Sequence, residues 1–327
     1  MKKLLKIFPY GDIMTYSTFS QLIKEKNMKK GILFAALTAI LFVTLEPVSA
    51  LIKEDVTPFA ITLWRFIIGS VMMLPFAIMK IKKEQIKITG KDIALIGLLG
   101  AFVICLSMIA LQMGVKEAGK EAAPLIAIIF SSNSIFTIVF SVFILKDKIT
   151  SNKIIALVLG VIGVVLCADF SLGANITSVL FAVFASLSFS LYTVLSKKFM
   201  KKFSGIIQTS FGFLLGSMVL LVFLLVMGAA TGDPAYAIVP SAIGPGVVIN
   251  LVYLGIFVTG LGYLFYFKAM EHGGAIMASL AFFIKPILTP FVSLIIVPDA
   301  KLSWQMFAAV ACIALASYFA TYRKQKN

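Results

Sequence analysis

Ten long apolar segments run along the chain, separated by short breaks rich in charged residues, glycine or proline. Each is close to the ~20 residues that a helix needs to cross a bilayer core about 30 Å thick. Runs such as FTIVFSVFIL are apolar on every side, whereas barrel strands would alternate, so we predict an all-α integral membrane protein with ten transmembrane helices. The predicted helices cover residues 31–52, 58–80, 92–115, 122–145, 152–169, 174–196, 204–227, 245–268, 275–297 and 303–322.

Composition agrees with a membrane protein. The chain is 60% hydrophobic and only 13% charged, against roughly a quarter charged in soluble domains. Its mean hydropathy of +1.04 is too high for a water-soluble fold.

The lysines and arginines predict the orientation, because translocated loops contain few of them. Of the 29, we place 23 on one side of the membrane, 4 on the other, and Arg65 and Lys285 inside helices. We therefore predict a multi-pass protein of the cell membrane with both termini cytoplasmic and residues 228–244 external. The net charge of +15 is then a topology signal. A nucleic-acid partner would need a soluble basic face, which the sequence lacks.

An internal repeat divides the chain. An offset of 147 residues places RFIIGSVMML on GFLLGSMVLL, one of 155 places LGAFV on LGIFV, and one of 152 matches Thr137, Ser141 and Asp147 with Thr289, Ser293 and Asp299. We predict a cytoplasmic N-terminal extension (1–27), a first repeat (28–170) and a second repeat (171–327), with Met1 and Met28 both open as the natural start. Five helices per repeat force the second copy to enter from the opposite side, which is the inverted repeat of secondary transporters.

Several motifs resemble the drug/metabolite transporter superfamily in its EamA-like branch. AVFASLSFSLYTVLSKKFM, with Lys197 near its end, is similar to the family's sixth helix, and WRF with Arg65 to its second. Asp147 and Asp299 resemble the acidic turns after its fourth and ninth helices. The resemblance covers nearly the whole chain from Met28 and implies ten helices in two five-helix repeats. Family members carry amino acids, phosphorylated or nucleotide-linked metabolites, or drugs, so the substrate stays open.

Lys285 is the most unusual residue for a membrane segment. It lies close to the centre of residues 275–297, where a charge costs roughly 2.5–3.5 kcal/mol. Pro286 and Pro290 each remove a backbone donor and free a carbonyl, so we expect a broken helix beside a polar cavity. We predict that Lys285 faces the bundle interior and binds substrate. The alternative is a structural ion pair or a carbonyl contact.

Glu46 and Arg65 are the other two ionisable groups within the membrane. Both lie roughly 10 Å below the outer surface at 1.5 Å per residue, so an ion pair between them is permitted. The repeat offsets place Thr193, Gly212 and Asn133 opposite Glu46, Arg65 and Lys285, so the pseudo-symmetry breaks at all three charges, as an asymmetric ligand requires. We predict both as substrate-binding residues and Glu46 also as the coupling residue. A purely structural salt bridge is the alternative.

Further substrate-binding candidates are polar and aromatic residues within the helices. Asn133 lies beside Ser131, Ser132 and Ser134, which also serve as interhelical hydrogen-bonding groups in many membrane proteins. Aromatic rings can stack on a substrate, although most pack against other helices. The candidates are Asn133, Trp64, Tyr263 and Tyr266, with Tyr192 and Tyr253 as further aromatics.

Catalytic and metal motifs are absent from the sequence. Residues 114–121 have GxxxxGK spacing, but Glu121 replaces the magnesium-binding Ser or Thr. Cys105, Cys167 and Cys312 are isolated, and His272 is the only histidine. We therefore predict no catalytic residue, no metal site, no cofactor and no enzyme activity.

The predicted function is secondary active transport of a small polar metabolite, amino-acid-like, zwitterionic or anionic, by alternating access. The partners are the small-molecule substrate and the lipid bilayer, with a proton as the candidate coupling ion. A drug or toxic-metabolite exporter of the same fold is the main alternative. A membrane enzyme or signalling protein is less well supported, because the sequence has no interfacial catalytic cluster and no sizeable soluble module.

Overall fold

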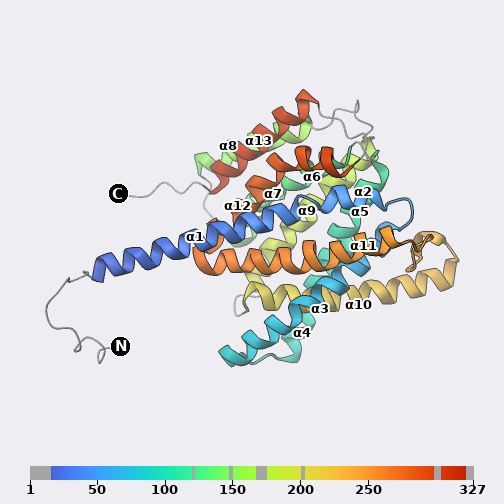
Figure 1. Ribbon diagram of the computed structural model, residues 1–327, viewed down its shortest axis with the longest axis horizontal. Coiled ribbons are helices and arrows are strands. Elements are labelled where there is room, and N and C mark those ends of the chain that lie inside the picture. Colours follow the sequence, from blue (N-terminus) through green and yellow to red (C-terminus); the bar gives the residue numbers. More distant parts are fainter. Residues whose placement is uncertain are drawn as a thin grey trace.

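The computed structural model describes residues 16–119, 122–146, 150–166, 175–199, 203–297 and 303–321. Within these ranges every regular element is a helix, and the helices form one bundle (Figure 1). The elements are α1 (Tyr16–Phe42), α2 (Leu45–Leu51), α3 (Pro58–Glu84), α4 (Gly90–Phe102), η1 (Val103–Met108), α5 (Ile109–Glu117), α6 (Ala123–Ser131), α7 (Asn133–Leu145), α8 (Ser151–Leu166), α9 (Ile176–Phe199), α10 (Gly205–Thr231), η4 (Pro234–Tyr236), α11 (Pro245–Tyr253), η5 (Leu254–Leu261), α12 (Gly262–Ile296) and α13 (Trp304–Thr321).

The helices have the length and surface of membrane spans. Across the part of the chain that the structure describes, seven are long and apolar enough to cross a bilayer, and three shorter apolar helices fall in the remaining predicted segments. The surface of α10 exposes Val219, Val222 and Leu225 by 50%, 59% and 56%. Rows of exposed aliphatic side chains suit contact with lipid tails. The chain is therefore a multi-pass membrane protein.

Helix bounds repeat along the chain at the offsets found in the sequence. α3 (58–84) shifted by 147 residues gives 205–231, the bounds of α10. The apolar span Gly90–Glu117 shifted by 155 residues gives Pro245–His272, the bounds of another span. π-Helical turns are rare in proteins, yet both of these spans contain one, η1 in the first and η5 in the second. Duplication therefore extends from side chains to local backbone geometry.

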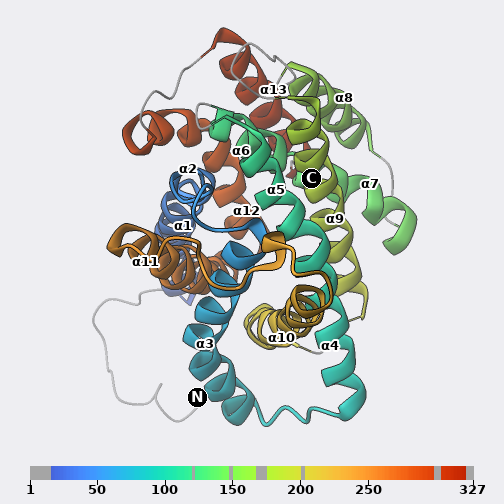
Figure 2. The same ribbon diagram turned by 90° about the vertical axis from the view of Figure 1, so that its right-hand side faces the viewer.

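Equivalent helices from the two halves pack antiparallel against each other. The rings of Phe66 and Phe213, which are 147 residues apart, meet edge to face at 4.5 Å. The rings of Phe59 and Phe223 lie 6.5 Å apart, so residue numbers rise along α3 as they fall along α10. Figure 2 shows α3 and α10 beside each other with α4 next to α10.

α12 remains helical through residues 269–274, where the sequence predicted a break between the eighth and ninth transmembrane helices. Its contacts nevertheless require the chain to reverse direction. His272 stacks on Phe34 of α1 at 5.7 Å, whereas Lys285 reaches Glu46, twelve residues further along the first apolar segment. A straight helix would carry Lys285 away from Glu46. The chain therefore turns back between His272 and Lys285, and the two parts of α12 run in opposite directions.

Irregular backbone lies elsewhere than predicted. The helix of the ninth segment continues through Pro286 and Pro290 to Ile296, so the expected break at these prolines is wrong. Breaks instead separate α1 from α2 at residues 43–44 and α6 from α7 at Ser132. α1 also begins at Tyr16, well before the predicted residue 31. Five residues named in the sequence analysis lie outside the described ranges: Met1, Glu121, Asp147, Cys167 and Asp299.

Candidate functional site

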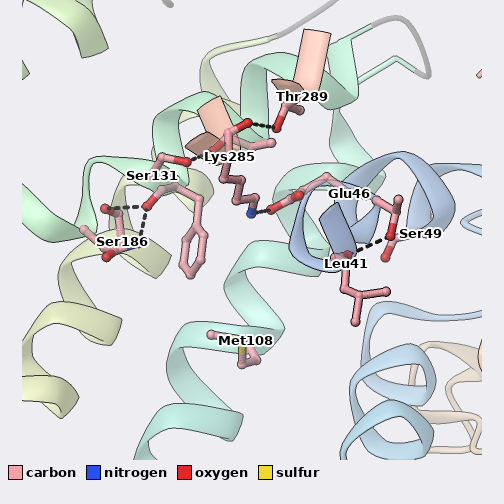
Figure 3. Close-up of polar contacts among 12 residues, drawn as sticks. Leu41, Glu46, Ser49, Met108, Ser131, Ser186, Lys285 and Thr289 are labelled. Carbon is pink, nitrogen blue, oxygen red and sulfur yellow. Dashed lines mark hydrogen bonds and ion pairs between the residues drawn. The ribbon is translucent and has the colours of Figure 1, made fainter. Parts of the chain in front are cut away.

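A buried ion pair joins the two halves of the molecule. Lys285 Nζ donates to Glu46 Oε1 at 2.6 Å, and both side chains are nearly fully buried, at 3% and 0% exposed (Figure 3). The lysine therefore points into the bundle, as predicted. The ion pair that equal depth permitted, between Glu46 and Arg65, is not among the salt bridges of the described residues, because Glu46 pairs with Lys285 on α12 instead.

The break between α1 and α2 sets the position of Glu46. Thr44, just before α2, donates its hydroxyl to the carbonyl of Leu41 at 2.8 Å and lies 3.0 Å from the hydroxyl of Tyr253. These contacts hold the irregular backbone at residues 43–44 against the helix that carries Tyr253. Glu46 then falls in the first turn of α2, where the exposed backbone amides of a helix N-terminus favour a carboxylate.

The break in the fourth segment lies on the other side of Lys285. Nζ of Lys285 is 5.4 Å from the ring centre of Phe130, within range of a cation–π contact. Ser132, at the break, hydrogen-bonds the hydroxyl of Ser186 on α9 at 3.0 Å. The side-chain amide of Asn133 donates to the backbone carbonyl of Phe130 at 2.8 Å, and the backbone carbonyl of Asn133 accepts from the hydroxyl of Ser190 at 2.6 Å. Asn133 therefore helps to hold the break rather than contacting the ion pair.

Arg65 is buried with few partners of its own. The side chain is 2% exposed, and its Nη2 contacts the thioether Sδ of Met108 at 3.2 Å. The guanidinium carbon lies 4.4 Å from the ring centre of neighbouring Phe66, while Nε has no hydrogen-bond partner. The group remains close enough to Glu46 and Tyr263 for electrostatic interaction. A guanidinium has five donors, so the protein leaves much of its binding capacity unused.

Gln112 is a polar member of this region that the sequence analysis missed. It lies on α5, is 2% exposed, and donates through Nε2 to Ser49 Oγ of α2 at 3.2 Å. Its Oε1 has no partner. Met108, which contacts Arg65, is one turn earlier in the same span. The signal that could have found this position is a single amide inside an apolar run (MIALQMGV).

The predicted aromatic residues divide between packing and loop attachment. Tyr263 packs 5.1 Å from the rings of both Phe42 and Phe213 and interacts electrostatically with Arg65. Tyr266 packs on Phe267 at 5.4 Å. Trp64 instead donates its indole N–H to the carbonyl of Ile238 at 2.9 Å, which attaches the loop 232–244 to α3. Tyr263 is therefore the predicted aromatic residue for which the structure gives an interaction with the charged cluster.

The charged cluster therefore combines both halves of the chain, and the halves also match one family separately. Residues 29–168 and residues 176–322 each match the model of the EamA-like transporter family. The chain belongs to the EamA-like transporter family. The resemblance drawn from the motifs is thereby confirmed.

Relatives of this EamA-like chain are named as transporters. One in Clostridium kluyveri, an "uncharacterized transporter", is 33% identical over 282 residues, which is 84% of this chain and 87% of the relative. Another in Archaeoglobus fulgidus is 26% identical over 71% of this chain and 78% of its own length. The uncharacterized transporter YyaM of Bacillus subtilis is 25% identical over 79% and 82%.

A solved crystal structure has the same fold as this EamA-like chain. It superimposes with a TM-score of 0.62 over 89% of this chain and 95% of the other, at 19% sequence identity. At that identity the similarity concerns the fold alone. The family match and the named relatives make this chain a membrane transporter, and Glu46, Arg65 and Lys285 are charged side chains buried in its interior.

Proposed function

We propose that the protein is a secondary active transporter that moves a small polar metabolite across the cytoplasmic membrane by alternating access. The observation that carries the proposal is the Glu46–Lys285 ion pair, because it joins the first half to the second in the buried centre of the bundle. Rocking of one half against the other would change this contact. Removing two charges from water costs free energy, so a buried pair of this kind is expected where the charges serve structure or function.

The arrangement of helices supports alternating access. In our proposal ten transmembrane helices form two inverted five-helix repeats with both termini cytoplasmic. The antiparallel packing of the equivalent helices α3 and α10 fits an axis in the membrane plane. α1 also packs antiparallel along the first part of α12, where Thr38 contacts Gly262 and Phe34 contacts His272. Its repeat equivalent α9 packs antiparallel along the η1–α5 span, where Ser107 donates to the carbonyl of Ala185 and Asn175 to that of Glu117.

The charges indicate an anionic or zwitterionic solute. Glu46 and Lys285 neutralise each other, so Arg65 supplies the uncompensated positive charge of the cluster. A carboxylate binds a guanidinium through two parallel hydrogen bonds. Glu46 is the proposed coupling residue, because protonation would release Lys285 and weaken the link between the halves.

A charge-pair experiment separates a functional role from a structural one. Replacing one partner leaves a buried unpaired charge, which is expected to destabilise the fold by about 3–5 kcal/mol. The double variant Glu46→Gln/Lys285→Met removes both charges and is expected to unfold near the wild-type temperature. In proteoliposomes offered a defined mixture of amino acids, organic acids, sugars and nucleosides, we expect wild type to accumulate a subset of these solutes. The double variant should lose at least nine-tenths of that uptake.

The matched control is Lys82→Met/Glu84→Gln, which removes the same two charges from exposed positions on α3. It should keep both stability and uptake. Full uptake by the folded double variant would make the buried pair structural and contradict the proposed site. Wild-type vesicles that move no solute of the mixture, with the protein shown to be folded, would contradict transport itself.

A further inference from the structure

Three buried polar atoms of the charged cluster lack a hydrogen-bond partner. They are Glu46 Oε2, Arg65 Nε and Gln112 Oε1. In the described part of the chain, the other buried side-chain atoms without a hydrogen-bond partner are the hydroxyl oxygens of Ser204, Ser210 and Ser293. Buried polar groups are nearly always paired, so a set of unpaired ones in one region points to a missing partner.

Short contacts connect the three groups. Gln112 donates to Ser49, which is one turn beyond Glu46 on α2. Met108, one turn before Gln112, contacts Arg65. Figure 3 shows the tip of Lys285 meeting Glu46, with Ser49 on the far side of Glu46 and Met108 on a neighbouring helix. The unpaired atoms therefore belong to one continuous patch formed by α2, α3 and the η1–α5 span.

The chemistry of the patch defines a complementary ligand. Arg65 offers donors and a positive charge, which suit a carboxylate. Glu46 Oε2 and Gln112 Oε1 are both acceptors, which suit an ammonium or a hydroxyl group. Gln112 is uncharged, so it adds a requirement for a donor without changing the charge of the site. A plain carboxylic acid would leave both acceptors unpaired.

We propose that Gln112 is a specificity-determining residue that selects short acids carrying a hydrogen-bond donor next to the carboxylate. The carboxylate binds Arg65, and the ammonium or hydroxyl group donates to Gln112 Oε1 and Glu46 Oε2. This inference rests on the proposed transport function and names the substrate class of the same site. A site built to hydrogen-bond a substrate group rejects analogues that lack the group far more strongly than a purely apolar pocket does.

Four compounds on one carbon skeleton test the requirement. Leucine, 2-hydroxy-4-methylpentanoate, 4-methylpentanoate and 3-methylbutylamine differ only in the groups that the patch is proposed to recognise. The alanine and phenylalanine series, built the same way, cover smaller and larger ligands. Binding is measured by the shift in Tm of the purified full-length protein, and transport by competition against the solutes that wild type accumulates. In at least one series, the amino or hydroxy acid should bind at least tenfold more tightly than the plain acid and the amine.

Variants of Gln112 assign the preference to this residue. Gln112→Met keeps the length of the side chain but removes the acceptor, and should reduce the tenfold preference to less than threefold. Gln112→Glu keeps an acceptor, adds a negative charge, and should favour the amino acid over the hydroxy acid more than wild type does. Met113→Leu, on the neighbouring position of α5, is the control and should leave the preference unchanged.

Two results would overturn the inference while leaving transport intact. One is a plain acid that binds wild type as tightly as its amino and hydroxy analogues, or a sugar or nucleoside that is transported while all three acid series fail to bind. The other is a Gln112→Met variant that retains the wild-type preference. Should Gln112→Met fail to fold, an unchanged preference in Gln112→Glu would overturn the inference in its place. Failure of wild type to move any solute belongs instead to the proposed function.

Discussion

At the scale of single residues, the three charges of the buried cluster, Glu46, Arg65 and Lys285, differ in how far the protein satisfies them. Glu46 and Lys285 share a short ion pair, whereas Arg65 has a thioether and an aromatic ring in place of a carboxylate. Sulfur is a weak acceptor. The protein thus holds the guanidinium in place without neutralising it, which is the condition that an anion-binding arginine requires.

Arg65→Lys tests whether the planar guanidinium matters in addition to its charge. Lysine keeps the positive charge but cannot form two parallel hydrogen bonds with a carboxylate. We expect KM for the transported solute to rise at least tenfold in Arg65→Lys, and uptake to be lost in Arg65→Gln. Initial rates in proteoliposomes measure both effects, with Lys82→Gln as the exposed control. Equal KM values for wild type and Arg65→Lys would exclude a two-bond contact with the substrate.

The sequence predicted which residues belong to this region but not how they pair. Depth along a helix can be counted from its ends, and it placed Glu46 and Arg65 at one level. The direction in which each side chain points depends on the break at residues 43–44. Pro47, which lacks the backbone N–H that would bond the carbonyl of Val43, marks this break in the sequence but does not show where Glu46 points. Gln112 was missed for a related reason: a single amide in an apolar helix shows its partner only when the helices are packed.

At the scale of the helices, two glycine crossings connect the halves at equivalent places. A Cβ atom on Gly100 of α4 would lie 1.9 Å from the carbonyl oxygen of Gly212 on α10, so these backbones touch. The repeat offsets relate Gly100 to Gly255 and Gly216 to Gly69. A Cβ on Gly69 would lie 3.0 Å from the carbonyl oxygen of Gly255. Glycine thus lets helices of opposite halves approach closely at both crossings, backbone against backbone at Gly100 and with the side chain of Thr259 also in contact at Gly69.

Gly100→Ala is therefore expected to destabilise the fold strongly. The neighbour that the new methyl group meets is backbone, which cannot change rotamer, so the effect should reach or exceed the ~3 kcal/mol at the upper end of ordinary overpacking. Gly97→Ala is the matched control on the same helix, because its nearest atom would be a side-chain carbon at 3.5 Å. Thermal unfolding in detergent measures both. Equal Tm values for the two variants would show that the α4–α10 backbones are further apart.

Helices were easier to predict than their irregularities. Apolar length fixed the spans, and the offsets of 147 and 155 residues agree with the helix bounds because both copies meet the same bilayer. The π-helical turns and the break at Ser132 could not be read from periodicity, since they interrupt the regular α-helical backbone without interrupting the apolar pattern. Pro286 and Pro290 led to the opposite error: they predicted a break that the structure lacks, because a packed bundle can keep a proline-containing helix continuous.

At the scale of the whole molecule, polar contacts tie the halves together at both ends of the bundle. At one end the loop 232–244 crosses the start of α3, where Ser241 N donates to the carbonyl of Asp55 at 2.8 Å (Figure 2). At the other end Lys80 of α3 pairs with Glu271 of α12 at 2.6 Å. Alternating access requires the contacts at one end to open while those at the other stay closed.

The inversion of the repeats is open to a direct test at the loops that follow α3 and α10. These helices are equivalent, so the loop after α3 and the loop 232–244 occupy matching places in the two copies. Residues 80–91 contain five lysines, whereas residues 228–244 contain no lysine or arginine, which predicts opposite sides of the membrane. Single cysteines at Lys87 and Val239, both exposed, are introduced after Cys105, Cys167 and Cys312 are replaced by alanine.

A membrane-impermeant maleimide applied to intact cells should label Val239→Cys, and should label Lys87→Cys only after the cells are made permeable. The reason is geometric: an odd number of crossings separates the two loops when the second copy is inverted. A duplication without inversion would place matching loops on one side, and both cysteines would then label together. In that case equivalent helices would run parallel, the two halves could not exchange roles across the bilayer, and alternating access by rocking of equivalent halves would have to be abandoned.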